Sequence, residues 1–285
     1  MSMEFSKFYN LKYNQYYIKK KNKKINKIYS QDAYWKFKNF RDPDGKKRNL
    51  LNEKNKKLED LKSEILFIKQ NAKKKTNPSI IDLGCGFGFF LSAFGKKWNK
   101  HGVEISKKAK SYSKKWGTIH ESSLVKKINL KKINSGKKFD FVFSYHVIEH
   151  LSKPEKFIEN CHDILKNDGY LILGTPNFDS GCARRFKNNY RFYKDKTHIS
   201  LFSESSLSRL LQDKGFKILA VDFPYFDTNH FNKKNFNRLT NTNKVSPPFY
   251  GNIMTFYCKK MNKHQLKKLY SFQRTNLRKL LSINE

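Results

Sequence analysis

The feature that most constrains this chain is a short apolar strand that runs into a glycine-rich turn and then into a predicted helix. It reads Ile80-Ile81-Asp82-Leu83-Gly84-Cys85-Gly86-Phe87-Gly88-Phe89-Phe90. Glycine adopts positive φ and lets a ligand approach the backbone, and the unpaired amides at the start of a helix point toward that ligand. A single Gly-x-Gly would fit an ordinary turn. Three glycines at a spacing of two, after a strand-end aspartate, favour a binding turn for a nucleotide-like ligand.

Strand-like and helix-like segments alternate along the middle of the chain. After the first strand, we expect strands at 101–105, 118–121, 139–143, 170–174, 216–221 and 253–258. We expect helices at 58–72, 91–97, 106–117, 152–168 and 203–215. A capping box at 152–155 would open the fourth helix, and Ser203 would cap the fifth. This alternation predicts an α/β fold with a doubly wound, mostly parallel, seven-stranded sheet and helices on both faces.

The two ends of the chain differ from this middle region. Residues 1–55 are rich in Tyr and Lys, and we expect them to cover an active site or to pack on the outside. Helical spacing of Tyr9, Tyr13, Tyr16 and Tyr17 predicts one helix there, and 30–37 predicts another. Residues 56–260 form the predicted main domain, with a long substrate lid at 175–200 and a loop at 228–248. Residues 261–285 are predicted to form a C-terminal helix.

Charge and cysteine usage limit the partners and the compartment. The net charge is +36, from 60 Lys and Arg against 24 Asp and Glu, which points to a polyanionic partner such as nucleic acid, an anionic lipid surface or a phosphorylated substrate. The lysines are scattered and accompany many Asn, Ile, Phe and Tyr, so A+T-rich codon usage explains them equally directly. The four cysteines form no Cys-x-x-Cys pair, and we expect reduced thiols in a cytoplasmic protein without a signal peptide or membrane span.

An acidic residue after the second strand narrows the ligand. Glu104 follows Gly84 by twenty residues, and ligands of open α/β sheets bind at the carboxyl ends of the strands. A carboxylate there can accept hydrogen bonds from both hydroxyls of a ribose. The turn and Glu104 together therefore predict an adenosine-containing cofactor, either a dinucleotide or S-adenosylmethionine. Dinucleotide sites favour Gly-x-Gly-x-x-Gly, whereas this chain has Gly-x-Gly-x-Gly after Asp82.

Three segments in this order resemble the class I S-adenosylmethionine-dependent methyltransferases. Asp82 to Gly88 is similar to the first motif of that family, Phe139 to Leu151 to its fourth strand and the start of the next helix, and Leu165 to Leu173 to the turn into its fifth strand. The resemblance covers residues 78 to about 222. The later Thr197 to Ser203, followed by a helix that ends at Gly215, resembles the subset that acts on small molecules, such as quinone rings and sugars of surface polysaccharides.

The resemblance implies roles for individual residues. S-adenosylmethionine would be bound by Asp82, Gly84, Cys85, Gly86, Gly88, Glu104, Ile105, Ser122, Ser123, Leu124, Ser144 and Tyr145. Among these, Glu104 would take the ribose hydroxyls, and Ser144 and Tyr145 would line the sulfonium end. His146 and His198 would be the catalytic bases, because imidazole titrates near neutrality. Arg184, Arg191 and Tyr193 in the lid would clamp an anionic group of the acceptor.

A metal ion is the alternative use of the same histidines. Similar quinone-ring and small-RNA methyltransferases bind a divalent metal through Glu-x-x-Glu-His and a later histidine. This chain has His146, Glu149, His150 and later His198, and the change at the first position alters the ligand set. We therefore expect no metal.

The predicted function is S-adenosylmethionine-dependent methyl transfer to a small metabolite. O-methylation of a sugar, nucleotide-sugar or surface-polysaccharide precursor is favoured. The net charge keeps an RNA methyltransferase open as an alternative, although Asn-Pro-Pro-Tyr, which is typical of DNA-base methylation, is missing after the fourth strand. A non-catalytic module that binds the cofactor is the other alternative. The identity of the acceptor and the oligomeric state stay open.

Overall fold

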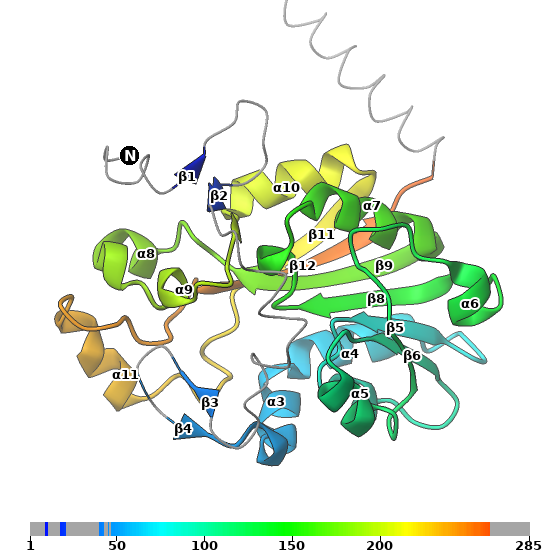
Figure 1. The fold of residues 1–285 in the computed structure, drawn as a ribbon, viewed down its shortest axis with the longest axis horizontal. Coiled ribbons are helices and arrows are strands. Elements are labelled where there is room, and N and C mark those ends of the chain that lie inside the picture. The colour runs from blue at the N-terminus through cyan, green and yellow to red at the C-terminus, as the bar shows by residue number, and fades with distance from the viewer. Residues whose placement is uncertain (1–8, 11–17, 21–39, 43–44, 46, 263–285) are drawn as a thin grey trace, which may run out of the picture.

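The computed structural model describes residues 9–10, 18–20, 40–42, 45 and 47–262. Its centre is a seven-stranded sheet in the order β11-β12-β9-β8-β5-β6-β7 (Figure 1). The neighbouring strands from β9 through to β7 pair in parallel, and β12 pairs antiparallel with both β9 and β11. The predicted mostly parallel, seven-stranded fold is confirmed.

The strands of this sheet are β5 (Ser79–Leu83), β6 (Asn99–Val103), β7 (Thr118–His120), β8 (Phe139–Tyr145), β9 (Leu165–Pro176), β11 (Phe216–Asp222) and β12 (Ile253–Lys260). The helices are α3 (Lys54–Asp60), α4 (Lys62–Asn71), α5 (Lys107–Ser113), α6 (Leu130–Asn134), α7 (Pro154–Ile164), α8 (Gly181–Phe186), α9 (Arg191–Lys194), α10 (Glu204–Asp213) and α11 (Lys233–Asn237). Short strands β1 (Tyr9–Asn10), β2 (Ile18–Lys20) and β10 (Ser200–Leu201) form one small sheet, and β3 (Phe40–Arg41) pairs with β4 (Lys47–Arg48).

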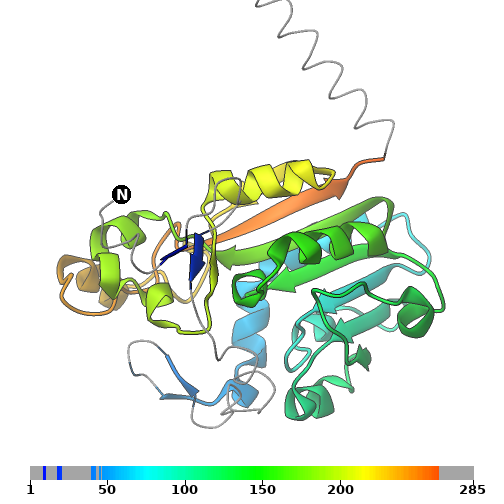
Figure 2. The same cartoon turned by 45° about the horizontal axis from the view of Figure 1, so that its top comes forward.

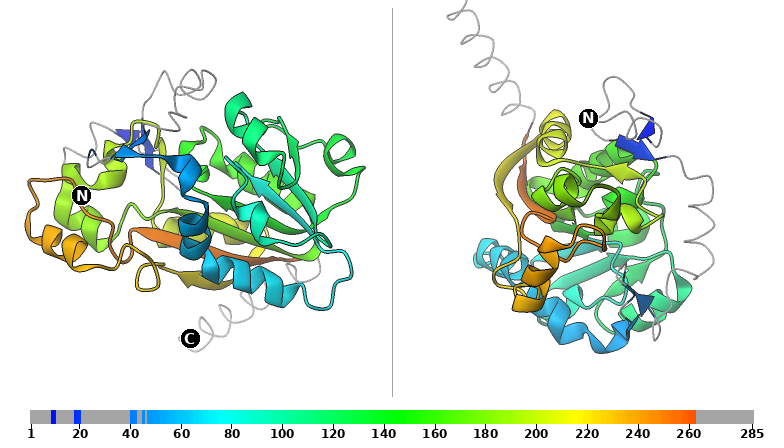
Figure 3. Two further views of the ribbon diagram at one scale, coloured as in Figure 1. Left: turned by 90° about the horizontal axis from the view of Figure 1, so that it is seen from below. Right: turned by 90° about the vertical axis from the view of Figure 1, so that its left-hand side faces the viewer.

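Successive side chains of the central strands enter two different cores. Phe141 and Phe143 of β8 belong to the core that α4 covers, whereas Val142 belongs to the core that α7 and α10 cover. The views in Figures 2 and 3 show α7 and α10 over one face of the sheet and α4 over the other. Because side chains alternate across a strand, a strand buried on both faces reads as a continuous apolar run. This is why the central strands could be located from the sequence.

The first two predicted helices differ in detail. The helix at 58–72 is divided into α3 and α4 at the buried residue Leu61. The helix predicted at 91–97 is wrong in length, because a 3-10 turn at Phe90–Ala93 is followed by extended Phe94. The ring of Phe94 contacts those of Phe90 and Trp98, with centroids 5.2 and 4.7 Å away, so packing on the sheet replaces the helix.

Helix caps give a mixed result. Ser203 caps α10 and Ser106 caps α5, as predicted. The capping box at 152–155 is wrong: Lys153 is the N-cap of α7 and makes no side-chain cap bond, although Pro154 does occupy the first turn. The helix predicted to run to 117 ends at Ser113.

The inserted segments are folded and compact. Residues 175–200 contain α8, a 3-10 turn and α9, which surround a small core of Phe178, Phe186, Tyr190 and Leu201. The predicted loop at 228–248 contains α11 and a 3-10 turn at Arg238–Thr240. Tyr9 lies in strand β1, so a helix that includes Tyr9 is wrong. The rest of that prediction, the helix at 30–37 and the C-terminal helix from residue 263 on fall outside the described residues. Within the described part of the chain, every helix is too short or too polar to cross a membrane.

Candidate active site

The glycine turn follows β5 and is held by the neighbouring strand. The amides of Gly84 and Cys85 donate to the carbonyl oxygen of Val103 at 2.9 and 3.0 Å. Gly84 has φ +86°, and a Cβ at this position would overlap the side chain of Val147, which lies in the turn after β8. Both the backbone conformation and the close approach therefore require glycine here. The turn leads into the 3-10 helix at 90–93 and not into an α-helix. The backbone of the turn itself, and not the first turn of an α-helix, therefore forms this wall of the site.

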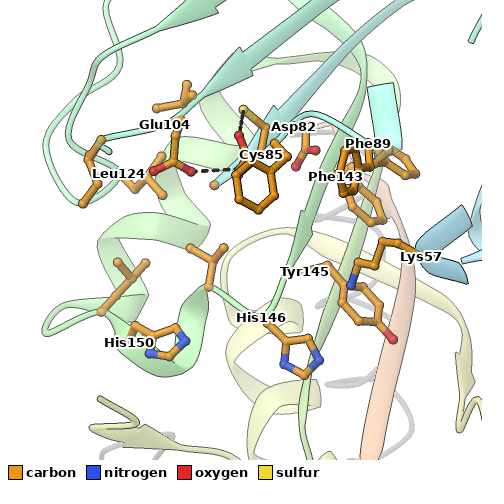
Figure 4. A pocket seen from close by; sticks show the side chains of 18 of the residues that line it. Lys57, Asp82, Cys85, Phe89, Glu104, Leu124, Phe143, Tyr145, His146 and His150 are labelled. Atoms are coloured by element: carbon orange, nitrogen blue, oxygen red, sulfur yellow. Dashed lines mark hydrogen bonds between the residues drawn. The ribbon is translucent and has the colours of Figure 1, made fainter. Parts of the chain in front are cut away.

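Glu104 is fixed at the end of β6 by two backbone donors. The Gly86 amide donates to its Oε2 and the Ser106 amide to its Oε1, both at 2.8 Å. The side chain is only 5% exposed and lies beside the glycine turn (Figure 4). Two charge-assisted bonds from the backbone hold the carboxylate in one orientation before any ligand arrives.

Asp82 and Lys57 are two ionisable groups that line the cavity beside the turn. Burial raises the pKa of Asp82 to about 8, with Lys57 opposing the rise and Glu104 adding to it. Burial lowers the pKa of Lys57, which nearby carboxyl groups oppose. The Lys57 Nζ lies 4.8 Å from the centroid of the Tyr145 ring. Lys57 was missed by the sequence analysis; the signal was its place one turn before Leu61 on the apolar face of the helix.

These groups surround one cavity of about 820 Å³ at the carboxyl ends of β5, β6 and β8. Most of the predicted cofactor residues line it, namely Asp82, Gly84, Cys85, Gly86, Glu104, Ile105, Ser123, Leu124 and Tyr145. Three predicted residues lie outside the lining. Gly88 contacts α5, where an added Cβ would lie 2.9 Å from the Ser113 Cβ, and the Ser144 hydroxyl donates to the Leu83 carbonyl oxygen at 2.9 Å. Ser122 is the third. Their direct contact with the cofactor stays a prediction.

His146 occupies the opposite wall of the cavity. Its backbone has φ +57°, and its amide donates to the Gly174 carbonyl oxygen at 2.9 Å, which turns the ring toward the cavity. Its Nδ1 lies 3.1 Å from Oε1 of Glu149. Figure 4 shows His146 below the turn residues, next to Tyr145. A non-glycine residue with positive φ is strained, and such strain concentrates at functional sites.

Glu149 is fully buried behind His146 and is ionised. The Thr175 hydroxyl donates to its Oε2 at 2.9 Å. Burial favours the neutral acid, but the hydrogen bond with His146 and the nearby histidines outweigh it and lower the pKa of Glu149 to about 2. Burial also lowers the pKa of His146, with Glu149 opposing the shift. A neutral imidazole that donates Nδ1–H to Glu149 has its Nε2 lone pair available to accept a proton.

His150 also lines the cavity, and the ring of His198 packs against it, with ring centroids 4.7 Å apart. Ligand atoms of Glu149, His150 and His198 all lie within 4.8 Å of one another, so three of the four residues considered for a metal are close together. The two Nδ1 atoms face backbone oxygens, that of His150 at 3.2 Å from Thr197 and that of His198 at 2.9 Å from Phe192. His198 is outside the cavity lining and only 5% exposed. Its side chain does not reach the cavity in this conformation, and its role as a base stays a prediction.

The predicted anion clamp lies away from the cavity lining. Arg184 is exposed and forms an ion pair with Asp179. Arg191 is buried and donates from Nη1 to the Ser246 carbonyl oxygen at 3.3 Å. The Tyr193 hydroxyl donates to the Phe178 carbonyl oxygen at 2.9 Å, inside the small core of the insertion. In this conformation the three side chains stabilise the insertion, and a clamp on the acceptor stays a prediction.

Sequence comparisons identify relatives of the main domain. Residues 51–221 match the family model described as a methyltransferase domain. An uncharacterised protein of Methanocaldococcus jannaschii is 30% identical over 159 residues, which span 55% of this chain and 71% of that protein. A ubiquinone biosynthesis O-methyltransferase of Pelagibacter ubique is 26% identical over 168 residues, which span 56% of this chain and 65% of the relative.

Solved structures share the fold. The candidate methyltransferase in complex with the Haloferax volcanii Trm112 methyltransferase activator has a TM-score of 0.57 at 11% identity, over 75% of this chain and 93% of that one. A candidate methyltransferase from Bacillus halodurans has a TM-score of 0.52 at 16% identity, over 70% and 100% of the two chains. At such low identity, these likenesses concern the fold alone.

Proposed function

The chain belongs to the methyltransferase-domain family and is an S-adenosylmethionine-dependent methyltransferase, and we propose that it methylates a hydroxyl group of a small metabolite. The observation that carries this proposal is the His146–Glu149 pair on the cavity wall. A hydroxyl is a weak nucleophile until its proton is removed, and a neutral histidine oriented by a buried carboxylate is a suitable general base. The O-methyltransferase activity in the name of the Pelagibacter ubique relative agrees with this choice.

The glycine turn, Glu104 and the residues around them carry groups that suit the cofactor. Glu104, held by two amides, would accept the ribose hydroxyls, and the turn at Gly84 and Gly86 would pass the ribose and methionine portion without a Cβ in the way. Asp82 would meet the methionine ammonium group, and Lys57 its carboxylate. Leu124 and Ile105 would contact the adenine.

Side chains of this cavity can remove the proton that methyl transfer to a hydroxyl releases. S-adenosylmethionine, held by Glu104 and the turn at Gly84 and Gly86, would supply a sulfonium methyl group. The acceptor oxygen would form a bond to the methyl carbon in line with the carbon–sulfur bond, which breaks and leaves its electron pair on sulfur. His146 Nε2 takes the hydroxyl proton, and Glu149 stabilises the imidazolium that results. The cavity walls hold the acceptor near the methyl group and exclude water, and the gain from such alignment is large in two-substrate reactions.

The acceptor is proposed to be a sugar, nucleotide-sugar or surface-polysaccharide precursor, with hydroxylated aromatic rings as the nearest competing class. Transfer from methyl-labelled S-adenosylmethionine to a panel of these acceptors tests the proposal. We expect His146→Asn to bind the cofactor with unchanged affinity in calorimetry and to lose transfer to the accepted compound. Transfer at the native rate by His146→Asn would show that another group removes the proton. Labelling of RNA in preference to every small acceptor would favour the RNA alternative.

A further inference from the structure

The segment between β11 and β12 brings large aromatic side chains to the surface at one end of the molecule. It lies beside α8 and α9, as the yellow and orange part of the chain in Figures 1 and 3 shows. Phe226, Phe231, Phe236 and Tyr250 are 60%, 58%, 62% and 46% exposed. We call these four residues the aromatic patch. They are half of the large apolar side chains that the described residues expose, and such concentration in one segment marks an interaction surface.

Ring contacts join three of these four residues and anchor two of them. Phe226 contacts Phe231 and Tyr250, with centroids 5.3 and 5.4 Å apart. Both Phe226 and Phe231 also contact Tyr225, which is only 3% exposed and which packs on Phe249. The exposed rings are therefore held outward by a buried ring and cannot easily turn inward to bury themselves.

The segment that carries these rings is also basic. Residues 223–250 contain Lys233, Lys234, Arg238 and Lys244 and a single acidic residue, Asp227. The three lysines are exposed, and Lys233 lies three residues before Phe236 on α11, on the same side of that helix. A surface of apolar rings among lysines is complementary to a surface that is apolar below and negatively charged above.

We propose that the aromatic patch docks onto a membrane surface that contains anionic lipids. Phe and Tyr side chains enter the boundary between head groups and acyl chains, while lysines remain with the lipid phosphates. A second copy of this chain is a poor occupant, because each copy carries a net charge of +36. A nucleic-acid strand needs open ring faces for stacking, whereas Phe231 packs at 73° and 65° against Phe226 and Tyr225. The proposal is independent of the methyl acceptor.

Sedimentation with lipid vesicles tests the proposal. The probes are vesicles of phosphatidylcholine alone and vesicles of phosphatidylcholine with phosphatidylglycerol. We expect the native chain to sediment with the mixed vesicles only. A chain this basic will bind anionic vesicles through charge alone, so the decisive measurement is at about 0.5 M salt, where exposed charges are strongly screened. There we expect the native chain to stay bound. Phe226→Ser/Phe231→Ser should bind the mixed vesicles at least about tenfold more weakly, because it lacks two rings that would be buried in the lipid.

Matched variants separate the patch from general charge. Lys233→Glu/Lys234→Glu in α11 and Lys131→Glu/Lys132→Glu in α6 change the net charge equally at pairs of exposed adjacent lysines. We expect the α11 pair to weaken binding at low salt more than the α6 pair. Leu66→Ser, which removes an exposed apolar side chain from α4, should have no effect. S-adenosylmethionine binding by calorimetry reports whether each variant is folded.

Three outcomes would overturn the proposal. The first is that Phe226→Ser/Phe231→Ser stays bound at about 0.5 M salt like the native chain. The second is that this variant loses binding of a single-stranded RNA oligomer while it keeps vesicle binding, which would assign the patch to nucleic acid. The third is a dimer in analytical ultracentrifugation that the variant dissociates, which would assign the patch to a second copy.

Discussion

The two walls of the cavity are built by different means. On the glycine wall, which comprises the turn at 82–88 and Glu104, backbone amides fix the Glu104 carboxylate, which we propose to bind the ribose. On the histidine wall, residues 145–151, the key carboxylate is fixed by side chains: His146 and Thr175 hold Glu149. The glycine wall needs residues that can adopt the backbone conformation of the turn. The histidine wall needs the His146–Glu149 pair and the side chain of Thr175 that holds it.

This difference sets what each wall tolerates. The backbone wall depends on the absence of side chains at its glycines, so additions should disturb it. The side-chain wall depends on the protonation states of Glu149 and His146, so isosteric changes of charge should disturb it. The walls meet where Gly84 contacts Val147, and a change there should affect both.

The largest effect is expected from Glu149→Gln. With Thr175 donating to the amide oxygen, the amide NH2 would face His146 Nδ1 and force the proton onto Nε2. His146 could then no longer accept the acceptor proton, and methyl transfer should fall about 10²- to 10⁴-fold. Calorimetry should give an unchanged affinity for S-adenosylmethionine.

Glu64→Gln is the matched control for that substitution. Glu64 is also buried and also accepts a threonine hydroxyl, from Thr255 at 2.9 Å, but it lies on α4 outside the cavity lining. We expect it to keep its transfer rate. Equal losses of methyl transfer in Glu149→Gln and Glu64→Gln would mean that each buried carboxylate matters for folding alone. The proposed role of Glu149 in orienting His146 would then be wrong.

Gly84→Ala should be next in size and should act on cofactor binding. The new Cβ would overlap Val147 and would impose a side chain on a residue with φ +86°. Strain of about 1–3 kcal/mol from each of the two sources adds to about 2–6 kcal/mol, which predicts binding of S-adenosylmethionine weaker by at least roughly 30-fold, or an equivalent loss of stability. Calorimetry and thermal unfolding together measure the sum.

Gly136→Ala separates the two sources. Gly136 has φ +81° with no atom within 4 Å of the position of its Cβ, so its substitution measures backbone strain without a clash. The excess effect at Gly84 should be partly recovered in the double variant Gly84→Ala/Val147→Ala. If the double variant behaves like Gly84→Ala alone, the contact between the walls is unimportant.

The same contrast explains how far the sequence could lead. The strand positions, the glycine turn and Glu104 followed from local patterns, because the strand, turn and acidic residue lie within about twenty positions. His146 of the histidine wall was named from the family resemblance, but its pairing with Glu149 was not predicted, because Glu149 depends on Thr175 and His150 on Thr197, which only the packed β9 and insertion bring near. His198 has the residue type of a base and yet is buried behind the site. Lys57 reaches the cavity from α3, just before the helix that was predicted from an apolar stripe at 58–72.

A third prediction concerns the protonation of the glycine wall. The pKa of Asp82 is about 8, so this carboxyl group is mostly protonated at neutral pH in the free protein. The cationic cofactor favours the ionised form and should lower that pKa. Binding at neutral pH should then release a proton, and affinity should rise by up to about tenfold per pH unit as the pH approaches about 8.

Calorimetry in buffers of different ionisation enthalpy counts that proton. Asp82→Asn cannot release it and should bind the cofactor more weakly, with an affinity that is flat over the same pH range. Proton uptake in place of release, or the same pH dependence in Asp82→Asn, would place the titrating group elsewhere and remove Asp82 from the contact with the methionine ammonium.

The smallest effect on methyl transfer is expected from metal removal. This experiment tests directly whether the histidine wall is a charge pair or a metal centre. Glu149 can either orient His146 as a base or join His150 and His198 around a divalent cation, because its Oε1 is already 3.1 Å from His146. If Glu149 orients the base, chelator treatment should change methyl transfer by less than about twofold, whereas metal-assisted catalysis would lose most of its rate. Stoichiometric metal in protein purified without chelator, absent from His198→Gln, would instead make the histidine wall a metal centre. His198→Gln is informative because His198 lies outside the cavity lining, so its loss reports on the cluster and not on access to the acceptor.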